Sequence, residues 1–160
     1  MINVRAVALA GMMCLIVSAQ ARADVTGFIG VSPTPANRQV GGFAAGLGLL
    51  IVGFEFEYAN TTDDPAAGAP SLKVGSGNVL LQTPFPIFGF QPYLTTGVGF
   101  YSETLGVHDD TGLAYNTGGG VKIPLAGPLR LRVDYRMFRL GSGALYSPAH
   151  RVYAGINLKF

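Results

Sequence analysis

Charged residues recur at every second position in several short segments of this chain. Side chains alternate between the two faces of a β-strand, so each series would place its charges on a single face. Carboxylates and bases gathered on one face can form a hydrogen-bonded network, bind a small polar ligand or attract an anion. The residues of this pattern are Glu55, Glu57, Lys122, Arg130, Arg132, Asp134, Arg136, Arg151 and Lys159.

A second set of residues could carry nucleophilic chemistry. Ser147 precedes His150 by three residues, and His108 is followed by Asp109 and Asp110. A serine hydrolase needs a base within hydrogen-bond reach of its nucleophile and a third group that orients the base. Ser147 and His150 could be bent into contact in a loop. The alternative interpretation, which we favour, is that both histidines are solvated loop residues.

Oxygen ligands for a hard cation occur in two places. Asp63 and Asp64 are adjacent, and residues 108–110 supply two further carboxylates. A calcium site takes about six to eight oxygen ligands at suitable spacing. The chain has no loop motif of that kind, so we predict no metal site and no cofactor.

The elements that would position these residues are strands. Residues 151–160 alternate strictly: Val152, Ala154, Ile156, Leu158 and Phe160 share one face. The same reasoning predicts strands at residues 25–31, 42–49, 52–59, 72–83, 90–102, 113–123, 129–140 and 151–160. Strand 72–83 changes parity midway, which indicates a bulge. The connections are predicted to alternate between short turns and longer polar loops, the latter including residues 103–112 and 141–150.

Two hairpins allow a prediction of register. Pairing Leu49 with Val52 puts Phe43, Phe54, Phe56 and Tyr58 on one outward face. Pairing Ile123 with Leu129 would set Lys122 beside Arg130, with Tyr115 and Tyr135 outward. Leu50 and Ile51 are poor turn residues, because tight hairpins favour residues that tolerate positive φ. That turn is therefore predicted to shift by a residue or two.

Composition points to a closed barrel in a membrane. The chain is 49% hydrophobic and 12% charged, with a mean hydropathy of +0.36. Beyond its first segment it has no apolar run near the roughly 18 residues of a membrane-spanning helix. A closed antiparallel barrel pairs every backbone group and leaves no edge in lipid. The predicted fold is therefore all-β, an eight-stranded antiparallel up-and-down transmembrane β-barrel over residues 24–160.

The first residues resemble a secretion signal. A single basic residue, Arg5, precedes an apolar run over residues 6–17, and small residues follow at Ala19, Ala21 and Ala23. This arrangement predicts a signal peptide over residues 1–23, with cleavage after Ala23 or, alternatively, Ala21. The one cysteine, Cys14, would leave with it. Nine basic residues would then balance nine acidic ones, which argues against a nucleic-acid partner.

Several segments resemble the outer-membrane β-barrel domain family, which includes small eight-stranded barrels of the OmpA and OmpX kind. They are residues 91–93, 97–99, 116–124 and 131–136. The spacing of Tyr153, Gly155, Leu158 and Phe160 is similar to the signal by which such barrels reach their insertion machinery. The resemblance implies a bacterial outer-membrane location. It also implies contact with outer-membrane lipid and lipopolysaccharide, and a monomer.

The resemblance leaves activity open, because the family includes anchors, adhesins, small channels and lipid A-modifying enzymes. Inward parity collects six bases and three acids, in a barrel interior only wide enough for side chains to fill. We expect a non-enzymatic surface component whose charged lumen is plugged. A narrow anion-preferring channel or small-solute binder is the alternative, and a lipid A-modifying enzyme is the third. The loops offer few anchors for a partner, Tyr146 and Arg38 being the best.

Overall fold

The computed structural model describes residues 22–160. In this part of the chain, eight antiparallel strands close into one barrel, which confirms the predicted fold class. The strands are β1 (Arg22–Ser32), β2 (Arg38–Leu49), β3 (Val52–Thr61), β4 (Ser71–Gln82), β5 (Gln91–Leu105), β6 (His108–Pro124), β7 (Leu129–Leu140) and β8 (Ala149–Lys159). A short 3₁₀ helix, η1 (Pro65–Ala67), lies between β3 and β4.

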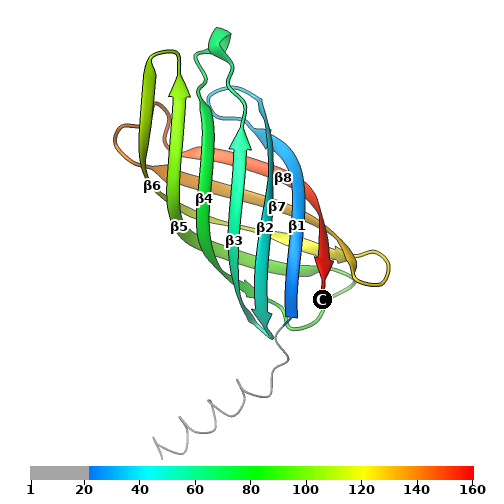
Figure 1. Cartoon of the computed structure of the whole chain (residues 1–160). Coiled ribbons are helices and arrows are strands. Elements are labelled where there is room, and N and C mark those ends of the chain that lie inside the picture. Colours follow the sequence, from blue (N-terminus) through cyan, green and yellow to red (C-terminus); the bar gives the residue numbers. More distant parts are fainter. Residues whose placement is uncertain (1–21) are drawn as a thin grey trace, which may run out of the picture.

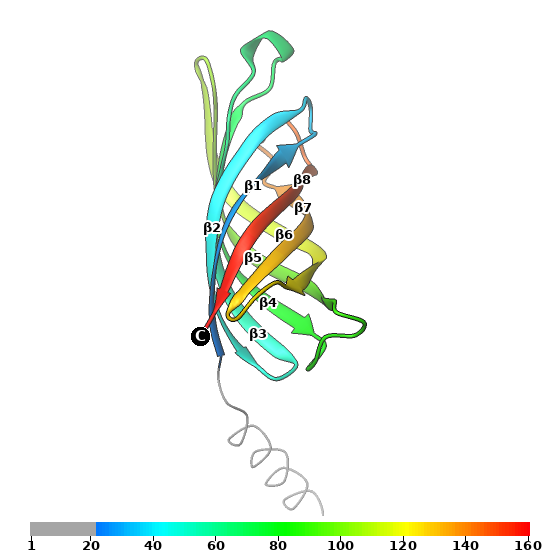
Figure 2. The same cartoon turned by 90° about the vertical axis from the view of Figure 1, so that its right-hand side faces the viewer.

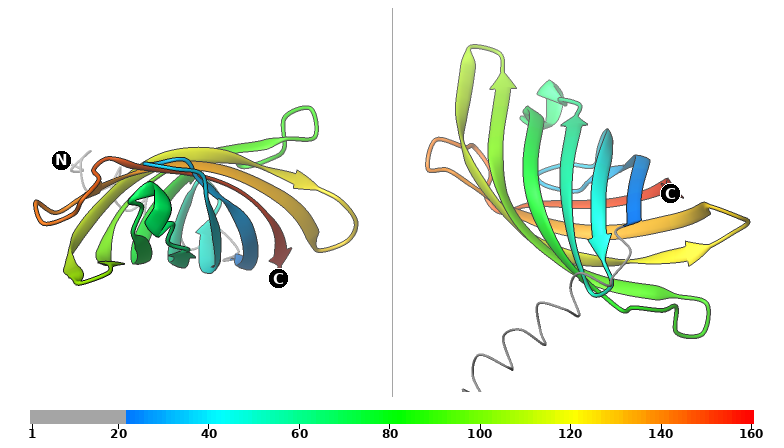
Figure 3. Two further views of the ribbon diagram at one scale, coloured as in Figure 1. Left: turned by 90° about the horizontal axis from the view of Figure 1, so that it is seen from above. Right: turned by 60° about the horizontal axis from the view of Figure 1, so that its bottom comes forward.

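Each strand pairs with its neighbours in the sequence, and β1 pairs with β8 to close the barrel. Figures 1 and 2 show that the strands of one wall, such as β2 and β3, are steeply inclined to those of the opposite wall, such as β7. Strand β8 lies beside β1 in Figures 1 and 3. We call the end with the β2–β3, β4–β5 and β6–β7 connections the turn end. The opposite end is the loop end. The C-terminal residue lies at the turn end (Figure 1).

No helix among residues 22–160 is both long enough and apolar enough to cross a membrane.

The predicted signal peptide lies outside the described residues, except for Arg22 and Ala23. These two residues belong to β1, where they pair with Gly48 and Leu47. Cleavage after Ala21 would leave β1 whole, whereas cleavage after Ala23 would remove its first two residues. The cleavage site stays a prediction.

The predicted register of the β2–β3 hairpin is confirmed. Leu49 pairs with Val52, and the ladder continues to Phe43 opposite Tyr58. The predicted shift of its turn is wrong, because Leu50 and Ile51 form the turn themselves. Leu50 adopts a left-handed conformation with φ of 51° to do so. Closing the ladder up to Leu49 therefore imposes a strained backbone on Leu50.

The predicted register of the β6–β7 hairpin is wrong by two residues, although its parity is right. Ile123 pairs with Leu131, and Lys122 with Arg132. Leu129 pairs with Leu158 of β8 and has no partner in the β6 ladder. Its main-chain oxygen accepts a hydrogen bond from Leu125 N at 2.9 Å and closes the turn. Gly127 supplies the positive φ of 55° that this wider turn needs. The shift sets Gly118 beside Arg136 and Gly120 beside Asp134.

The predicted bulge in β4 is also wrong. The strand pairs without interruption along β3 and β5. Leu72, Val74 and Leu80 point into the barrel, whereas Val79 and Leu81 are exposed on the outer surface. Leu72 and Val74 point inward because the barrel interior is itself apolar near the loop end, so no extra residue is needed.

The predicted loop over residues 103–112 is largely strand. Leu105 pairs with His108, and a two-residue turn at Gly106 and Val107 joins β5 to β6. The polar residues of this segment continue the ladder, so the hairpin extends at the loop end (Figure 1). The expected alternation between short turns and long loops consequently fails at this connection.

Candidate functional site

Seven charged residues of the predicted interior set are buried inside the barrel. Arg132 and Arg136 are 0% exposed, and the rest are at most 4% exposed. The seven residues are Glu55, Glu57, Lys122, Arg132, Asp134, Arg136 and Arg151. The other two members, Arg130 and Lys159, are half-buried at the turn end.

Glu55 on β3 is the centre of the network, because two arginines of β7 share its carboxylate. Arg132 binds both oxygens, with a distance of 3.2 Å from Nη2 to Oε1. Arg136 Nη2 donates to Oε1 at 2.8 Å. Arg132 and Arg136 each lie two positions from Asp134 along β7. Side chains alternate with period two along a strand, so all three point to the same face.

Asp134 and Tyr93 complete this part of the network. Arg136 Nε donates to Asp134 Oδ1 at 3.1 Å, and Arg132 Nη2 lies 3.3 Å from Oδ2. The Tyr93 hydroxyl donates to Asp134 and accepts from Arg132 Nε at 2.7 Å. Sequence reasoning missed Tyr93, although its inward parity within β5 was available. Both carboxylate oxygens of Asp134 are therefore satisfied.

Glu57 extends the network toward β8. Arg151 Nη2 forms an ion pair with Glu57, and Arg136 Nη2 lies 3.2 Å from its Oε2. The Arg151 guanidinium also lies 4.7 Å from the ring centroid of Phe138 and 5.3 Å from that of Phe28. Cations over aromatic faces are stabilised by the ring quadrupole. The last arginine is thus held by a carboxylate and by apolar rings together.

The central network is electrically balanced. Three arginines, at positions 132, 136 and 151, face three carboxylates, at positions 55, 57 and 134. The sequence count of six bases against three acids omitted Asp24, whose Oδ2 lies 2.6 Å from Lys122 Nζ. Asp24 was missed because the first strand was predicted to begin at Val25, one residue after it. The remaining bases, Arg130 and Lys159, lie outside the network.

An apolar layer lies in the interior near the loop end. It consists of the buried residues Leu72, Val74, Tyr101, Ala114, Phe138, Leu140 and Ala149. A polar contact between Asn116 Nδ2 and Asn78 Oδ1, 2.8 Å long, joins β6 to β4 nearby in the ladder. The interior therefore contains an ion network and an apolar layer, with this neutral polar pair nearby.

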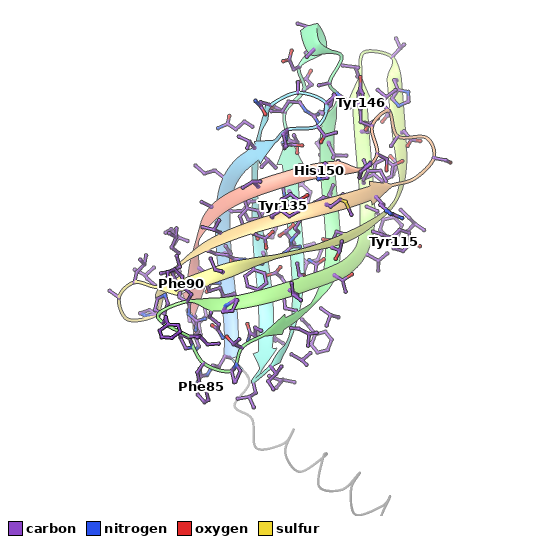
Figure 4. All side chains as sticks on the ribbon, turned by 180° about the vertical axis from the view of Figure 1, so that it is seen from behind. Phe85, Phe90, Tyr115, Tyr135, Tyr146 and His150 are labelled. Carbon is purple, nitrogen blue, oxygen red and sulfur yellow. The ribbon has the colours of Figure 1, made fainter. Side chains whose placement is uncertain are left out.

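The two candidate catalytic residues face different partners. The Ser147 hydroxyl accepts a hydrogen bond from Leu140 N at 3.1 Å. His150 Nδ1 lies 2.8 Å from the hydroxyl of Tyr135, on the outer surface of β7 and β8. Figure 4 shows His150 beside Tyr135. The structure does not bring Ser147 and His150 into a nucleophile–base pair.

The predicted loop residues His108, Asp109 and Asp110 lie on β6. His108 Nε2 is 3.5 Å from Glu103, Asp110 accepts from Tyr101, and Asp64 caps η1 by accepting from Ala67 N at 3.2 Å. Within residues 22–160, no group of three metal-binding side chains is close enough to hold an ion. These carboxylates have local structural contacts.

Arg38 is not the exposed loop anchor that the sequence predicted. It is 4% exposed, and its guanidinium donates to the main-chain oxygens of Pro70 and Thr34. Arg38 therefore ties the β1–β2 and β3–β4 connections together. Tyr146 is partly exposed, as a surface anchor would be.

Solved structures of similar shape identify the architecture. The N-terminal β-barrel domain of Pseudomonas aeruginosa OprF matches with a TM-score of 0.66 and 18% identity, over 89% of this chain and 100% of that one. Neisserial surface protein A matches with a TM-score of 0.62 and 18% identity, over 88% and 96%. This chain has the fold of the small outer-membrane β-barrels. A de novo designed transmembrane β-barrel gives a TM-score of 0.51 and 15% identity, over 87% and 95%. No family model and no curated protein matches the sequence.

The outer surface of this outer-membrane barrel fold is apolar and aromatic. The six predicted aromatics point outward, and all but the half-buried Tyr58 are largely exposed: Phe43, Phe54, Phe56, Tyr58, Tyr115 and Tyr135. Sequence reasoning missed Phe85, Phe88 and Phe90 in the β4–β5 connection, of which Phe88 is 97% exposed. Figure 4 shows Phe85 and Phe90 at the turn end and Tyr115 and Tyr135 farther toward the loop end. Aromatic side chains at both ends suit the two interfaces of a bilayer.

The four residues of the predicted insertion signal divide between the faces of β8 and its end. Tyr153 is buried and stacks on Phe28 with ring centroids 4.0 Å apart, and Gly155 is also buried. Leu158 is on the outer surface, and Phe160 is 73% exposed. The Phe160 amide donates to Ala23 O at 2.8 Å. Leu158 and Phe160 are thus the members accessible from outside.

Proposed function

We propose that this protein is a non-enzymatic, integral component of the bacterial outer membrane whose lumen is closed by its own side chains. The balanced network of three arginines and three carboxylates carries this proposal. A buried ion must be paired, and removing one partner leaves an uncompensated charge. A solute crossing the lumen would have to separate Glu55 from Arg132 and Arg136, and then pass the apolar layer.

The location follows from three features taken together. Residues 1–23 would direct secretion, the aromatic outer surface would contact lipid, and the last strand would be recognised by the insertion machinery through Tyr153, Gly155, Leu158 and Phe160. We infer that the turn end faces the periplasm and that the loop end, surrounded by lipopolysaccharide, faces outward. The barrel has no unpaired strand edge within residues 22–160, which supports a monomer.

The lipid A-modifying alternative is less favoured by the geometry. Ser147 is engaged by Leu140, and His150 by Tyr135 on the outer surface. A hydrolase would need the two side chains in contact and an acid behind the histidine. The proposal therefore treats both as structural residues, and unchanged lipid A on expression of the protein is the expected result.

Planar-bilayer conductance tests the closed lumen. The protein purified from outer membranes is first shown to be folded by its heat-modifiable migration in gels. The wild type should give no discrete current steps in low or high salt. Steps that prefer anions, and that change when Arg132→Gln or Arg136→Gln is introduced, would overturn the proposal in favour of a narrow anion channel. Lys73→Gln, a neutralised base on the outer surface, is the control for a nonspecific charge effect.

A further inference from the structure

A cavity opens at the turn end of the barrel, below the ion network. Its volume is about 290 Å³, near the lower limit of ligand pockets, which span about 300–1,000 Å³. Strands β1, β6, β7 and β8 contribute the basic residues Arg22, Lys122, Arg130 and Lys159 to its lining. A site of this size fits a small ligand or a headgroup.

Positive charge predominates in the lining. Its two acids are already engaged, since Asp24 pairs with Lys122 at 2.6 Å and Glu55 belongs to the ion network. Within residues 22–160, neither Arg130 nor Lys159 lies within ion-pair distance of a carboxylate. Two bases that form no ion pair and face one cavity attract an anion.

Glycine forms the wall on β2 and β3. Gly46, Gly48 and Gly53 line the cavity, and Gly48 pairs with Gly53. A methyl group added at Gly48 would lie 3.2 Å from Gln82 Nε2. The wall is therefore main chain at these positions, and a larger residue at Gly48 would meet the Gln82 side chain.

Polar neighbours hold one of these bases in place. Arg130 Nη1 donates to Gln91 Oε1 at 2.9 Å, and Gln91 Nε2 donates in turn to Thr83 O at 2.7 Å. The guanidinium is therefore oriented by a neutral partner, which adds no negative charge. Arginine in this state offers its remaining N–H groups to an oxyanion, and lysine adds a point charge.

We propose that this cavity binds a phosphate group, either as a free anion or as the headgroup of an anionic phospholipid. Arg130 and Lys159 bind the phosphate oxygens, and Arg22 adds charge at the rim if processing retains it. The site ends at the Lys122–Asp24 pair and the ion network. The inference does not rest on the lumen being closed.

Isothermal titration calorimetry with inorganic pyrophosphate tests the free-anion form, using protein purified from outer membranes in a neutral detergent. The wild type should bind saturably and more weakly as salt is added. Replacing both bases, as Arg130→Gln with Lys159→Gln, should weaken binding by about tenfold or more, because each lost charge-assisted hydrogen bond lowers affinity. The charge-keeping exchange, Arg130→Lys with Lys159→Arg, should retain most of the affinity.

Native mass spectrometry tests the headgroup form. Wild-type protein taken from vesicles of phosphatidylglycerol and phosphatidylcholine should retain phosphatidylglycerol, and the double glutamine variant should retain less. Lys73→Gln with Arg139→Gln, which removes two exposed bases of the outer surface, should behave as wild type in both experiments. Heat-modifiable migration establishes that each variant is folded.

The outcomes separate the two phosphate sources from failure of the proposal. Pyrophosphate binding that the glutamine variant loses supports a free anion, and selective phosphatidylglycerol retention that it loses supports a headgroup. Absence of both in the wild type would overturn the inference. Binding that survives in the folded double variant would overturn it equally, whatever the conductance experiment gives.

Discussion

At Gly155, a residue on the inner face of β8, the absence of a side chain is a packing requirement. An added methyl group would lie 2.6 Å from the carbonyl oxygen of Gly27 and 2.8 Å from Cβ of Phe28. The Phe28 ring is itself fixed by stacking on Tyr153. Gly27, in contrast, has open space where a methyl group would go. The two glycines therefore differ in what they tolerate.

Alanine substitution should distinguish them. Gly155→Ala should lower the free energy of unfolding by about 1–3 kcal/mol, the usual cost of forcing an extra carbon into a packed interior. Gly27→Ala should change it little or raise it slightly. Urea unfolding of the barrel in phospholipid vesicles measures both. Equal effects of the two substitutions would contradict the packing argument.

Glu55 matters for its charge, because its carboxylate compensates the positive charges of Arg132 and Arg136. Arg132 binds both carboxylate oxygens of Glu55, and Arg136 binds Oε1. Glu55→Gln should therefore destabilise the barrel by about 3–5 kcal/mol, since it leaves buried guanidinium charge uncompensated. The exposed Asp63→Asn is the matched control for loss of one acid. An unfolding midpoint equal to that of the control would be inconsistent with this role.

Among the elements, the β2–β3 hairpin carries local strain. Leu50 has a φ of 51°, a region that costs a residue with a side chain about 1–2 kcal/mol. A two-residue hairpin with positive φ at its first position favours glycine there. The strain persists because the register up to Leu49 and Val52 sets the outward face of both strands.

Replacing the strained residue should therefore stabilise the protein. Leu50→Gly is expected to raise the free energy of unfolding by about 1 kcal/mol, because glycine adopts the left-handed region without a steric penalty. Ile51→Gly has no such strain to relieve and should lower it. The comparison is made by urea unfolding, and a loss of stability with Leu50→Gly would show that the leucine side chain matters more than its backbone.

Strand β7 shows how one element serves two environments. Its even-numbered residues point inward, and three of them, Arg132, Asp134 and Arg136, form part of the ion network. Val133, in contrast, is 37% exposed on the outer surface between Val121 and Ala154. The register correction of two residues leaves this parity intact, because a shift by an even number keeps every side chain on its face. Parity, more than register, decides which residues meet lipid.

A charge on the outer face of β7 should act according to depth. Val133→Arg is expected to cost about 2–4 kcal/mol if the residue lies near the middle of the bilayer, and Leu129→Arg at the turn end about 0–1 kcal/mol. Stability in phospholipid vesicles is the measurement. Similar costs at the two positions would contradict the proposed placement of the barrel across the membrane.

For the whole molecule, closure depends on joining the first strand to the last. Val25 pairs with Leu158 and Asp24 with Lys159, and the Phe160 amide donates to Ala23 O. Phe160 itself adds an exposed aromatic side chain beyond the end of β8. Its main chain makes one hydrogen bond to β1, and its side chain is 73% exposed.

Deletion of Phe160 should accordingly impair assembly more than stability. We expect less protein in the outer membrane, while protein refolded in detergent unfolds at nearly the wild-type urea concentration. Phe160→Tyr, which keeps a terminal aromatic, should assemble normally. Wild-type outer-membrane levels of the deletion variant would argue against recognition of the last strand through this residue.

The sequence by itself determined the eight strands, their faces and the register of β2 and β3, because period-two alternation separates inside from outside along each strand. It also identified seven of the buried charges, since they share parity with small residues, but it missed Asp24 and Arg38. Only the tertiary structure decided which charges pair. Glu55 meets Arg132 and Arg136 across 77 and 81 residues, a contact set by strand order and barrel closure that no local pattern encodes. The register of β6 and β7 depended on the residue at which their turn closed. The apolar interior near the loop end depended on side chains from five strands that meet there.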